Sequence, residues 1–248
     1  MQLPELTQAL IDRGVTEVGY SHLEGLLPER LAGLPFGLTL LFKLSDAVVD
    51  EILLPDPPAP SYPYFQHYRT VNAFLDAQAL YAAAMLERMG ARAFPVAASQ
   101  SVPDAGEYAG LFPHKTAAVR AGLGWIGKSA LFVSPKYGPR VRLATVLTDY
   151  PLPSAPPVEL PGCGSCSACV TACPACAIKG APAEGNFTRS DLFDPAACST
   201  HMKRAYQHIG RGAVCGICMA VCPFGRKRRE PETPAGAEKA ATSALPER

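Results

Sequence analysis

The chain has 248 residues, enough for one large domain or two small ones, and 48% of them are hydrophobic, as is ordinary for a globular protein. Its net charge of +1 does not indicate a nucleic-acid or anionic-membrane partner, and no apolar run approaches the length of a membrane span. The first residues, Met1 to Glu5, lack the basic and apolar regions of a secretion signal. A cytoplasmic location is therefore predicted.

The region before the cysteines alternates between helical and extended patterns. Helices are predicted over residues 5–13, 66–89 and 113–121, and strands over residues 15–20, 38–44, 91–96, 130–134 and 141–148. Residues 47–54 are compatible with either a helix or a strand. This alternation predicts an α/β domain over residues 1–154.

Proline-rich and polar stretches suggest the domain limits. Five prolines between Pro151 and Pro161 mark a boundary, and residues 155–225 are predicted as a second domain. Residues 226–248 lack an apolar face and are predicted to form a disordered polar tail. The basic run from Arg226 to Arg229 could contact tRNA, but a solvated chain end explains it as well.

All nine cysteines lie between Cys163 and Cys222. Four follow the pattern C-x2-C-x2-C-x3-C-P, ending at Cys173, and three follow C-x2-C-x3-C-P, ending at Cys222. The first pattern is the bacterial ferredoxin spacing, in which three thiolates hold one [4Fe–4S] cluster and the fourth reaches another. Disulfide frameworks suit small secreted chains, and zinc sites usually have two separate C-x2-C pairs. Two [4Fe–4S] clusters are therefore predicted.

The ligands are expected to cross between the two motifs, by analogy with two-cluster ferredoxins. One expected set is Cys163, Cys166, Cys169 and Cys222. The other is Cys173, Cys198, Cys215 and Cys218. Cys176 is left over, and we predict that it is a small buried side chain and not a ligand.

A glycine-rich segment from Gly122 to Ser129 matches the G-x4-G-K-[ST] pattern of phosphate-binding loops. Such a loop must follow a strand and open a helix, whereas here a predicted helix precedes it and a predicted strand follows it. ATP or GTP binding is therefore not favoured. The tryptophan at its centre is either a buried anchor on a tight turn or part of the wall of a large cofactor pocket. The residues predicted to form that wall are Gly122, Gly124, Trp125, Gly127, Lys128 and Ser129.

Three segments in series resemble the epoxyqueuosine reductase family: residues 121–128, residues 147–152 and the spaced cysteines. The resemblance implies two [4Fe–4S] clusters and a cobalamin held by an N-terminal α/β domain related to reductive dehalogenases. It also implies removal of an epoxide oxygen in the last step of making the tRNA base queuosine. The expected fold is an α/β corrinoid-reductase-like domain followed by a ferredoxin-like double [4Fe–4S] module.

The sequence departs from that family at the catalytic acid. Where the family has an aspartate, counting back from the tryptophan without gaps leads to Tyr108. Tyr108, His114 and Lys115 are the predicted proton donors, with Asp104 and Glu107 as further candidates, because a cation beside a tyrosine lowers its pKa. Alternatively, Tyr108 is a half-buried loop aromatic and the other two begin a helix. No Asp-x-His-x-x-Gly pattern is present, so a corrinoid is predicted to bind without a protein histidine on cobalt.

Three functions stay open. The first is a cobalamin-dependent reductase of an unidentified substrate, supplied by a low-potential donor of the ferredoxin or flavodoxin type. The second is an electron-transfer protein or reductive activator that serves a partner corrinoid protein. The third, tRNA epoxyqueuosine reduction itself, is not favoured, because the usual family enzyme continues into a helical-repeat region and this sequence is shorter.

Overall fold

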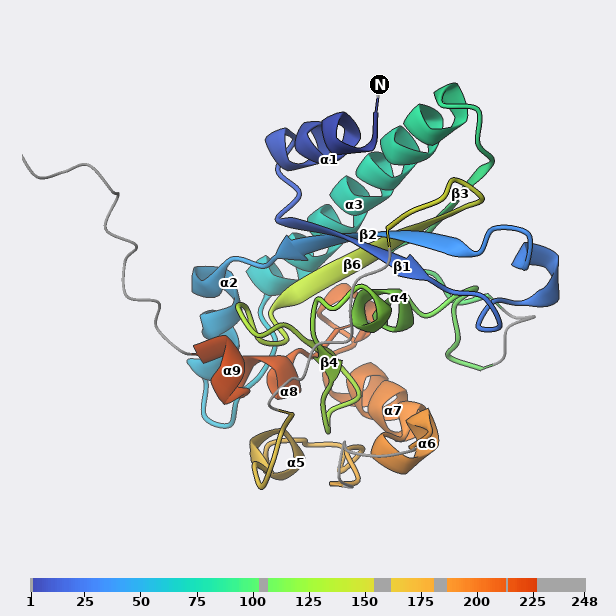
Figure 1. The fold of residues 1–248 in the computed structure, drawn as a ribbon. Coiled ribbons are helices and arrows are strands. Elements are labelled where there is room, and N and C mark those ends of the chain that lie inside the picture. The colour runs from blue at the N-terminus through green and yellow to red at the C-terminus, as the bar shows by residue number, and fades with distance from the viewer. Residues whose placement is uncertain (1, 103–106, 154–161, 181–186, 213, 227–248) are drawn as a thin grey trace, which may run out of the picture.

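The computed structural model describes residues 2–102, 107–153, 162–180, 187–212 and 214–226. The predicted polar tail, except for Arg226, therefore lies outside the described residues, as does most of the proline-rich boundary. No described helix is long and apolar enough to cross a membrane. Figure 1 shows a twisted sheet flanked by helices, with the cysteine-rich helices gathered at one side of it.

A four-stranded antiparallel sheet forms the centre of the N-terminal region. Its strands are β1 (Glu17–His22), β2 (Phe36–Lys43), β6 (Val141–Thr148) and β3 (Ala93–Val96), in the order β1-β2-β6-β3. Strands β2 and β6 are central and are covered on both faces, which explains their nearly continuous apolar sequences. All the strands predicted around this sheet are confirmed, with ends shifted by a few residues.

Helices α1 (Leu3–Asp12) and α3 (Tyr62–Arg88) cover one face of the sheet (Figure 1). Helix α3 begins where the Ser61 hydroxyl accepts a hydrogen bond from the Tyr64 N–H at 3.2 Å, and it ends before Gly90, whose φ is 89°. Its stripe of Val71, Leu75 and Leu86 packs with strands β2 and β6 in the main core. Both predicted helices are confirmed.

The opposite face of the sheet carries helix α4 (His114–Arg120). Ala117 packs with Leu147 of β6, and Ala118 packs with Leu41 of β2. After α4 the chain forms a small hairpin of β4 (Trp125–Ile126) and β5 (Phe132–Val133). The glycine-rich segment therefore joins a helix to a hairpin and does not open a helix, as the phosphate-loop interpretation would require.

Short helices make up the rest of the described chain. The ambiguous residues 47–54 are helical, because they fall in α2 (Asp46–Asp50) and the 3-10 helix η2 (Glu51–Leu53). Another 3-10 helix, η1, spans Glu29–Leu31. The cysteine-rich region contains α5 (Ala168–Thr171), α6 (Arg189–Leu192), α7 (Pro195–Ala205), η4 (Gly210–Gly212), α8 (Ile217–Ala220) and α9 (Pro223–Arg226).

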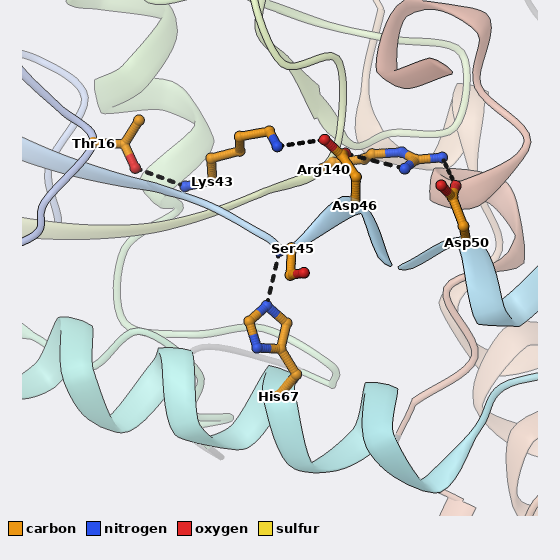
Figure 2. Close-up of polar contacts among 7 residues, drawn as sticks. All are labelled: Thr16, Lys43, Ser45, Asp46, Asp50, His67 and Arg140. Atoms are coloured by element: carbon orange, nitrogen blue, oxygen red, sulfur yellow. Dashed lines mark hydrogen bonds and ion pairs between the residues drawn. The ribbon is translucent and has the colours of Figure 1, made fainter. Parts of the chain in front are cut away.

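The cysteine-rich region shares a core with the N-terminal region. Ile217, Met219 and Ala220 of α8 belong to the same buried cluster as Ile52 and Tyr64. A second junction is polar, and Arg140, only 2% exposed, forms its centre. Its guanidinium pairs with Asp46 at 3.1 Å and Asp50 at 2.7 Å on α2 (Figure 2), and its Nη2 donates to the Ala220 carbonyl at 3.4 Å. These contacts fix the cysteine-rich helices against the sheet.

The start of α2 is also held from below by α3. The Ser45 N–H donates to Nε2 of His67 at 3.0 Å (Figure 2). Burial lowers the pKa of His67, which favours the neutral ring that this acceptor role requires. His67 is therefore occupied in positioning α2.

Candidate functional site

The first cysteine group joins the start of the cysteine-rich region to its end. Cys163 and Cys166 lie on the loop that leads into α5, Cys169 lies within α5, and Cys222 follows α8. Burial, together with the nearby thiols of Cys163, Cys222 and Cys166, raises the pKa of Cys169 to about 11. The four thiols are thus close enough to influence one another's pKa, and their role as one ligand set stays a prediction.

The second cysteine group surrounds a cavity, and its side chains, like those of the first group, are partly exposed. Its members, Cys173, Cys198, Cys215 and Cys218, all line one cavity of about 200 Å³. Burial and the thiols of Cys198 and Cys173 raise the pKa of Cys215 to about 11. Burial, with neighbouring thiols, also raises the pKa of Cys218. This is the second expected group, and the ligand role of all eight cysteines stays a prediction.

Cys176 does not behave as predicted. The sequence suggested a small buried side chain, but Cys176 is exposed and its φ is 49°. The left-handed backbone at this position turns the side chain outward after the cysteine motif. The prediction that it fills the interior is wrong.

The glycine–tryptophan segment lies against the first cysteine group. A Cβ added to Gly127 would be 3.2 Å from the Cys163 sulfur, so the missing side chain is what allows this approach. The Lys128 ammonium donates to the carbonyl oxygens of Gly164 at 2.6 Å and Cys166 at 3.1 Å. The buried Trp125 ring packs edge-on against Phe224, with ring centroids 5.0 Å apart.

The remaining glycine and serine positions shape the hairpin. A Cβ on Gly124 would lie 2.1 Å from the Val133 carbonyl oxygen, and Gly122 turns the chain after α4 with a φ of 71°. The Ser129 hydroxyl accepts a hydrogen bond from the Leu131 N–H at 3.4 Å. We expected this segment to wall the large cofactor pocket, but none of its six predicted residues lines the large cavity described next. Its described contacts with a site are those to the first cysteine group.

The large cavity, of about 820 Å³, opens beside β3 and β6. It is lined by the polar loop that follows β3, by the start of α4 and by part of β6, and all three predicted proton donors, Tyr108, His114 and Lys115, are among its residues. Asp104 lies outside the described residues, and Glu107 is exposed and is not part of the lining. The cavity is therefore the place where the predicted catalytic side chains meet.

A single wall separates the large cavity from the second cysteine group. Leu131, Pro139, Val141 and Arg142 line both cavities. None of the first group's cysteines lines either cavity. The second cysteine group therefore lies next to the large cavity.

His114 is held at both ring nitrogens. Nε2 lies 2.9 Å from the Ala97 carbonyl oxygen, and Nδ1 lies 2.9 Å from the Thr145 hydroxyl. A carbonyl oxygen can only accept, so Nε2 carries the proton and Nδ1 accepts from Thr145. Burial lowers the pKa of His114 to about 4, which keeps the ring neutral at pH 7. Of the three predicted donors, His114 is the least suited to supply a proton.

Lys115 is better suited. Its ammonium donates to the Ala130 carbonyl oxygen at 2.6 Å, and burial together with the Arg189 cation lowers its pKa to about 8. It is thus largely protonated at neutral pH, yet it titrates near that range. Tyr108 has a left-handed φ of 56°, and its carbonyl oxygen accepts a hydrogen bond from Arg189 at 2.9 Å.

Two arginines of the cavity were not predicted. Arg142 donates to the Asn72 side chain at 2.8 Å and to the Ala98 carbonyl at 3.3 Å, and it lies over the Tyr68 ring at 4.4 Å. A lone arginine inside the apolar strand Val141–Thr148 was the available signal. No such signal marked Arg189, because α6 reaches the cavity only through the tertiary fold.

Comparisons with known proteins identify the cysteine-rich domain and the fold. Residues 162–225 match the 4Fe-4S double cluster binding domain. An epoxyqueuosine reductase of Listeria monocytogenes is 31% identical over 153 residues, covering 58% of this chain and 36% of that protein. A solved epoxyqueuosine reductase from Streptococcus thermophilus gives a TM-score of 0.57 at 17% identity, over 91% of this chain and 67% of that one. A solved reductive dehalogenase, described with a mechanism for B12-dependent dehalogenation, gives a TM-score of 0.68 at 20% identity. This match covers 89% of this chain and 32% of that one.

These likenesses confirm the predicted resemblance to epoxyqueuosine reductases and the predicted fold, a mixed α/β region followed by a double-cluster domain. The chain spans about a third of the length of the curated relatives it matches. The match of residues 162–225 also confirms two [4Fe–4S] clusters as the cofactors of this domain. The chain is an iron–sulfur protein related to oxidoreductases.

Proposed function

We propose that the chain is a reductase that binds a cobalamin in the large cavity and supplies it with electrons through two [4Fe–4S] clusters. The observation that carries this proposal is the wall of Leu131, Pro139, Val141 and Arg142, which the second cysteine group and the large cavity share. Electron transfer requires proximity, and the two sites are adjacent. The electrons would come from a low-potential donor of the ferredoxin or flavodoxin type.

The eight grouped cysteines are the proposed cluster ligands. One cluster would be held by Cys163, Cys166, Cys169 and Cys222, and the other by Cys173, Cys198, Cys215 and Cys218. Burial disfavours thiolates in the metal-free chain, so binding of iron must displace the thiol protons. Folding of this region and assembly of the clusters are therefore expected to be coupled.

The large cavity is large enough for part of a corrinoid, and its chemistry suits one. A volume of about 820 Å³ is near the upper end for ligand pockets, and the lining mixes apolar side chains with backbone and side-chain polar groups. His114, the histidine in the lining, already has both ring nitrogens engaged, so it is not free to bind cobalt. When bound, the corrinoid would supply the low-valent cobalt needed for the reductive step.

The protein's own contribution to the reaction is a proton. Replacing a halide on carbon by hydrogen consumes two electrons and one proton and releases halide, and removing an epoxide oxygen as water consumes two electrons and two protons and leaves an alkene. We propose Lys115 as the donor, because it lines the cavity, its partly buried ammonium is held by the Ala130 carbonyl and its pKa is about 8. Tyr108 also lines the cavity and is the proposed second donor, whereas His114 would orient the loop that contains Ala97.

An anaerobic titration of the cluster-loaded chain with hydroxocobalamin tests this function. After reduction, a cobalt(II) electron spin resonance signal without axial nitrogen splitting, with cobalamin retained on gel filtration, is expected. Ala109→Trp should abolish retention by filling the cavity, whereas Leu54→Trp, on a side chain that is 79% exposed, should not. A free-cofactor signal with intact clusters would contradict the proposal and favour an electron carrier for a partner corrinoid protein.

A further inference from the structure

Two cationic side chains, Lys115 and Arg189, line the large cavity. Lys115 belongs to α4, and Arg189 reaches the same cavity from α6 of the cysteine-rich region. Among the described residues, the lining contains neither aspartate nor glutamate. We infer that Lys115 and Arg189 form a binding site for an oxyanion, a phosphate or carboxylate group, of the ligand in this cavity.

The two side chains have few other partners. The Lys115 ammonium donates to the Ala130 carbonyl at 2.6 Å, and one nitrogen of Arg189, Nη1, donates to the Tyr108 carbonyl at 2.9 Å. The charge of Arg189 helps to lower the pKa of Lys115, so the two cations are close enough to repel each other. Neither forms an ion pair with an acid in the described part of the chain.

The neighbouring arginines are satisfied differently. Arg140 is paired with Asp46 and Asp50 (Figure 2). Arg142 has Asn72, the Ala98 carbonyl and the Tyr68 ring. Lys115 is partly buried, whereas Arg189, also in the lining, is exposed. An incoming anion would compensate the partly buried Lys115 charge, and Arg189 would add a second, solvent-facing cation to hold it.

The geometry of the two groups suits an oxyanion. A guanidinium presents a planar fork to two oxygens of a carboxylate or phosphate, and an ammonium adds a compact point charge. The oxyanion could belong to the substrate or to the phosphodiester of a bound cobalamin. This choice of molecule rests on the proposed function, whereas the anion site itself does not.

The site is tested first with inorganic phosphate and no corrinoid. Calorimetric titration of the cluster-loaded chain should detect binding, and both Lys115→Met and Arg189→Gln should weaken it about tenfold, the order expected for a lost charge-assisted hydrogen bond. Arg204→Gln, a charge-matched change at an exposed position on α7, should bind phosphate as the unaltered chain does. Arg189→Lys keeps the charge and should weaken binding less than Arg189→Gln. Iron content and circular dichroism identify any variant that fails to fold.

The inference would be overturned if the unaltered chain did not bind phosphate. It would also be overturned if both charge-removing variants bound phosphate as tightly as the unaltered chain. The source of the anion follows from titrations with cobalamin and with cobinamide, which lacks the nucleotide phosphate. If the pair holds the cofactor, the two variants bind cobalamin about tenfold more weakly and cobinamide normally. If it holds the substrate, both corrinoids bind normally while phosphate binding is still weakened. Failure of all corrinoid binding would refute the proposed function but leave the phosphate result standing.

Discussion

The two cysteine groups differ in what surrounds them. The first lies beneath the glycine–tryptophan segment, and its loop includes the exposed Gly164, around which an added Cβ would meet nothing within 4 Å. The second is enclosed by α7, α8 and the tyrosines of α3, and an added Cβ on Gly216 would lie 2.8 Å from the Tyr64 ring. The first group is thus accessible from outside, whereas the second borders the large cavity.

This difference suggests a direction for the electrons. A donor protein can approach the first group closely, because small exposed residues such as Ser165 and Ser167 cover it. The second group is shielded by packing but is separated from the cavity only by their shared wall. Electrons would enter at the first cluster and leave through the second.

Removing one thiol from each group tests the division most strongly. Cys166→Ala and Cys218→Ala should each lower the iron content from about eight to about four per chain, because each removes a ligand of a different cluster. Cys176→Ala should keep all the iron, since its exposed thiol belongs to neither group. Chemical iron analysis of anaerobically purified chains gives the answer. Loss of all iron in either variant would show that the clusters are not independent.

Alanine substitutions of one glycine beside each cysteine group should differ in how much they destabilise the fold. Gly216 has a φ of 79° and is packed against Tyr64, so Gly216→Ala should cost about 2–4 kcal/mol from backbone strain and overpacking. Gly164 has a φ of 48° but open space around it, so Gly164→Ala should cost only about 1 kcal/mol. Thermal unfolding of the cluster-loaded chains measures both. Equal shifts would argue against the tighter packing of the second group.

The pKa of Lys115 tests the environment of the large cavity, which borders the second cysteine group. Its pKa of about 8 means that the reactive neutral amine should form near pH 8, whereas a model lysine peptide requires a pH of about 10.4. Proton donation by Lys115 should correspondingly decline as the pH rises through 8. Labelling with acetic anhydride at a series of pH values, followed by peptide mapping, measures the midpoint. A midpoint within one unit of the model peptide would contradict the buried, cation-flanked environment.

Substitution of Lys128 should affect the first cysteine group alone, and its expected effect on stability is the smallest of these predictions. Lys128→Met removes the hydrogen bonds to the Gly164 and Cys166 carbonyls and should cost about 1 kcal/mol, because the contacts are partly exposed. Half of the iron should then be lost to a chelator faster, while the other half keeps its rate. Lys179→Met, at an exposed lysine, is the matched control. Faster loss of both halves would place Lys128 in a shared role.

Periodic and closely spaced features were predictable from the sequence. Helix α3 and strands β2 and β6 bury regular apolar patterns, and the cysteine groups follow from motif spacing. Loop residues were harder. Gly124 reads as a turn residue, yet it matters because strand β5 passes against it, a contact that only the folded hairpin reveals.

The residues of the large cavity were also only partly predictable from the sequence. Lys115 and Tyr108 were found through their position in the sequence, because they lie near the glycine–tryptophan segment. Arg189 lies far from them along the chain, and only the packing of α6 brings it to the Tyr108 carbonyl. None of the six glycine–tryptophan residues lines the large cavity, so sequence proximity to the candidate donors did not determine which site this segment faces.

The most direct test of the account is the magnetic interaction between bound cobalt(II) and each reduced cluster. Electron spin relaxation of cobalt(II) should be fast in the unaltered chain and in Cys166→Ala, because both retain the cluster next to the cavity. It should become slow in Cys218→Ala, which lacks that cluster but still has the cavity. Slow relaxation in Cys166→Ala with fast relaxation in Cys218→Ala would contradict the assignment of the second cysteine group as the one that serves the cavity.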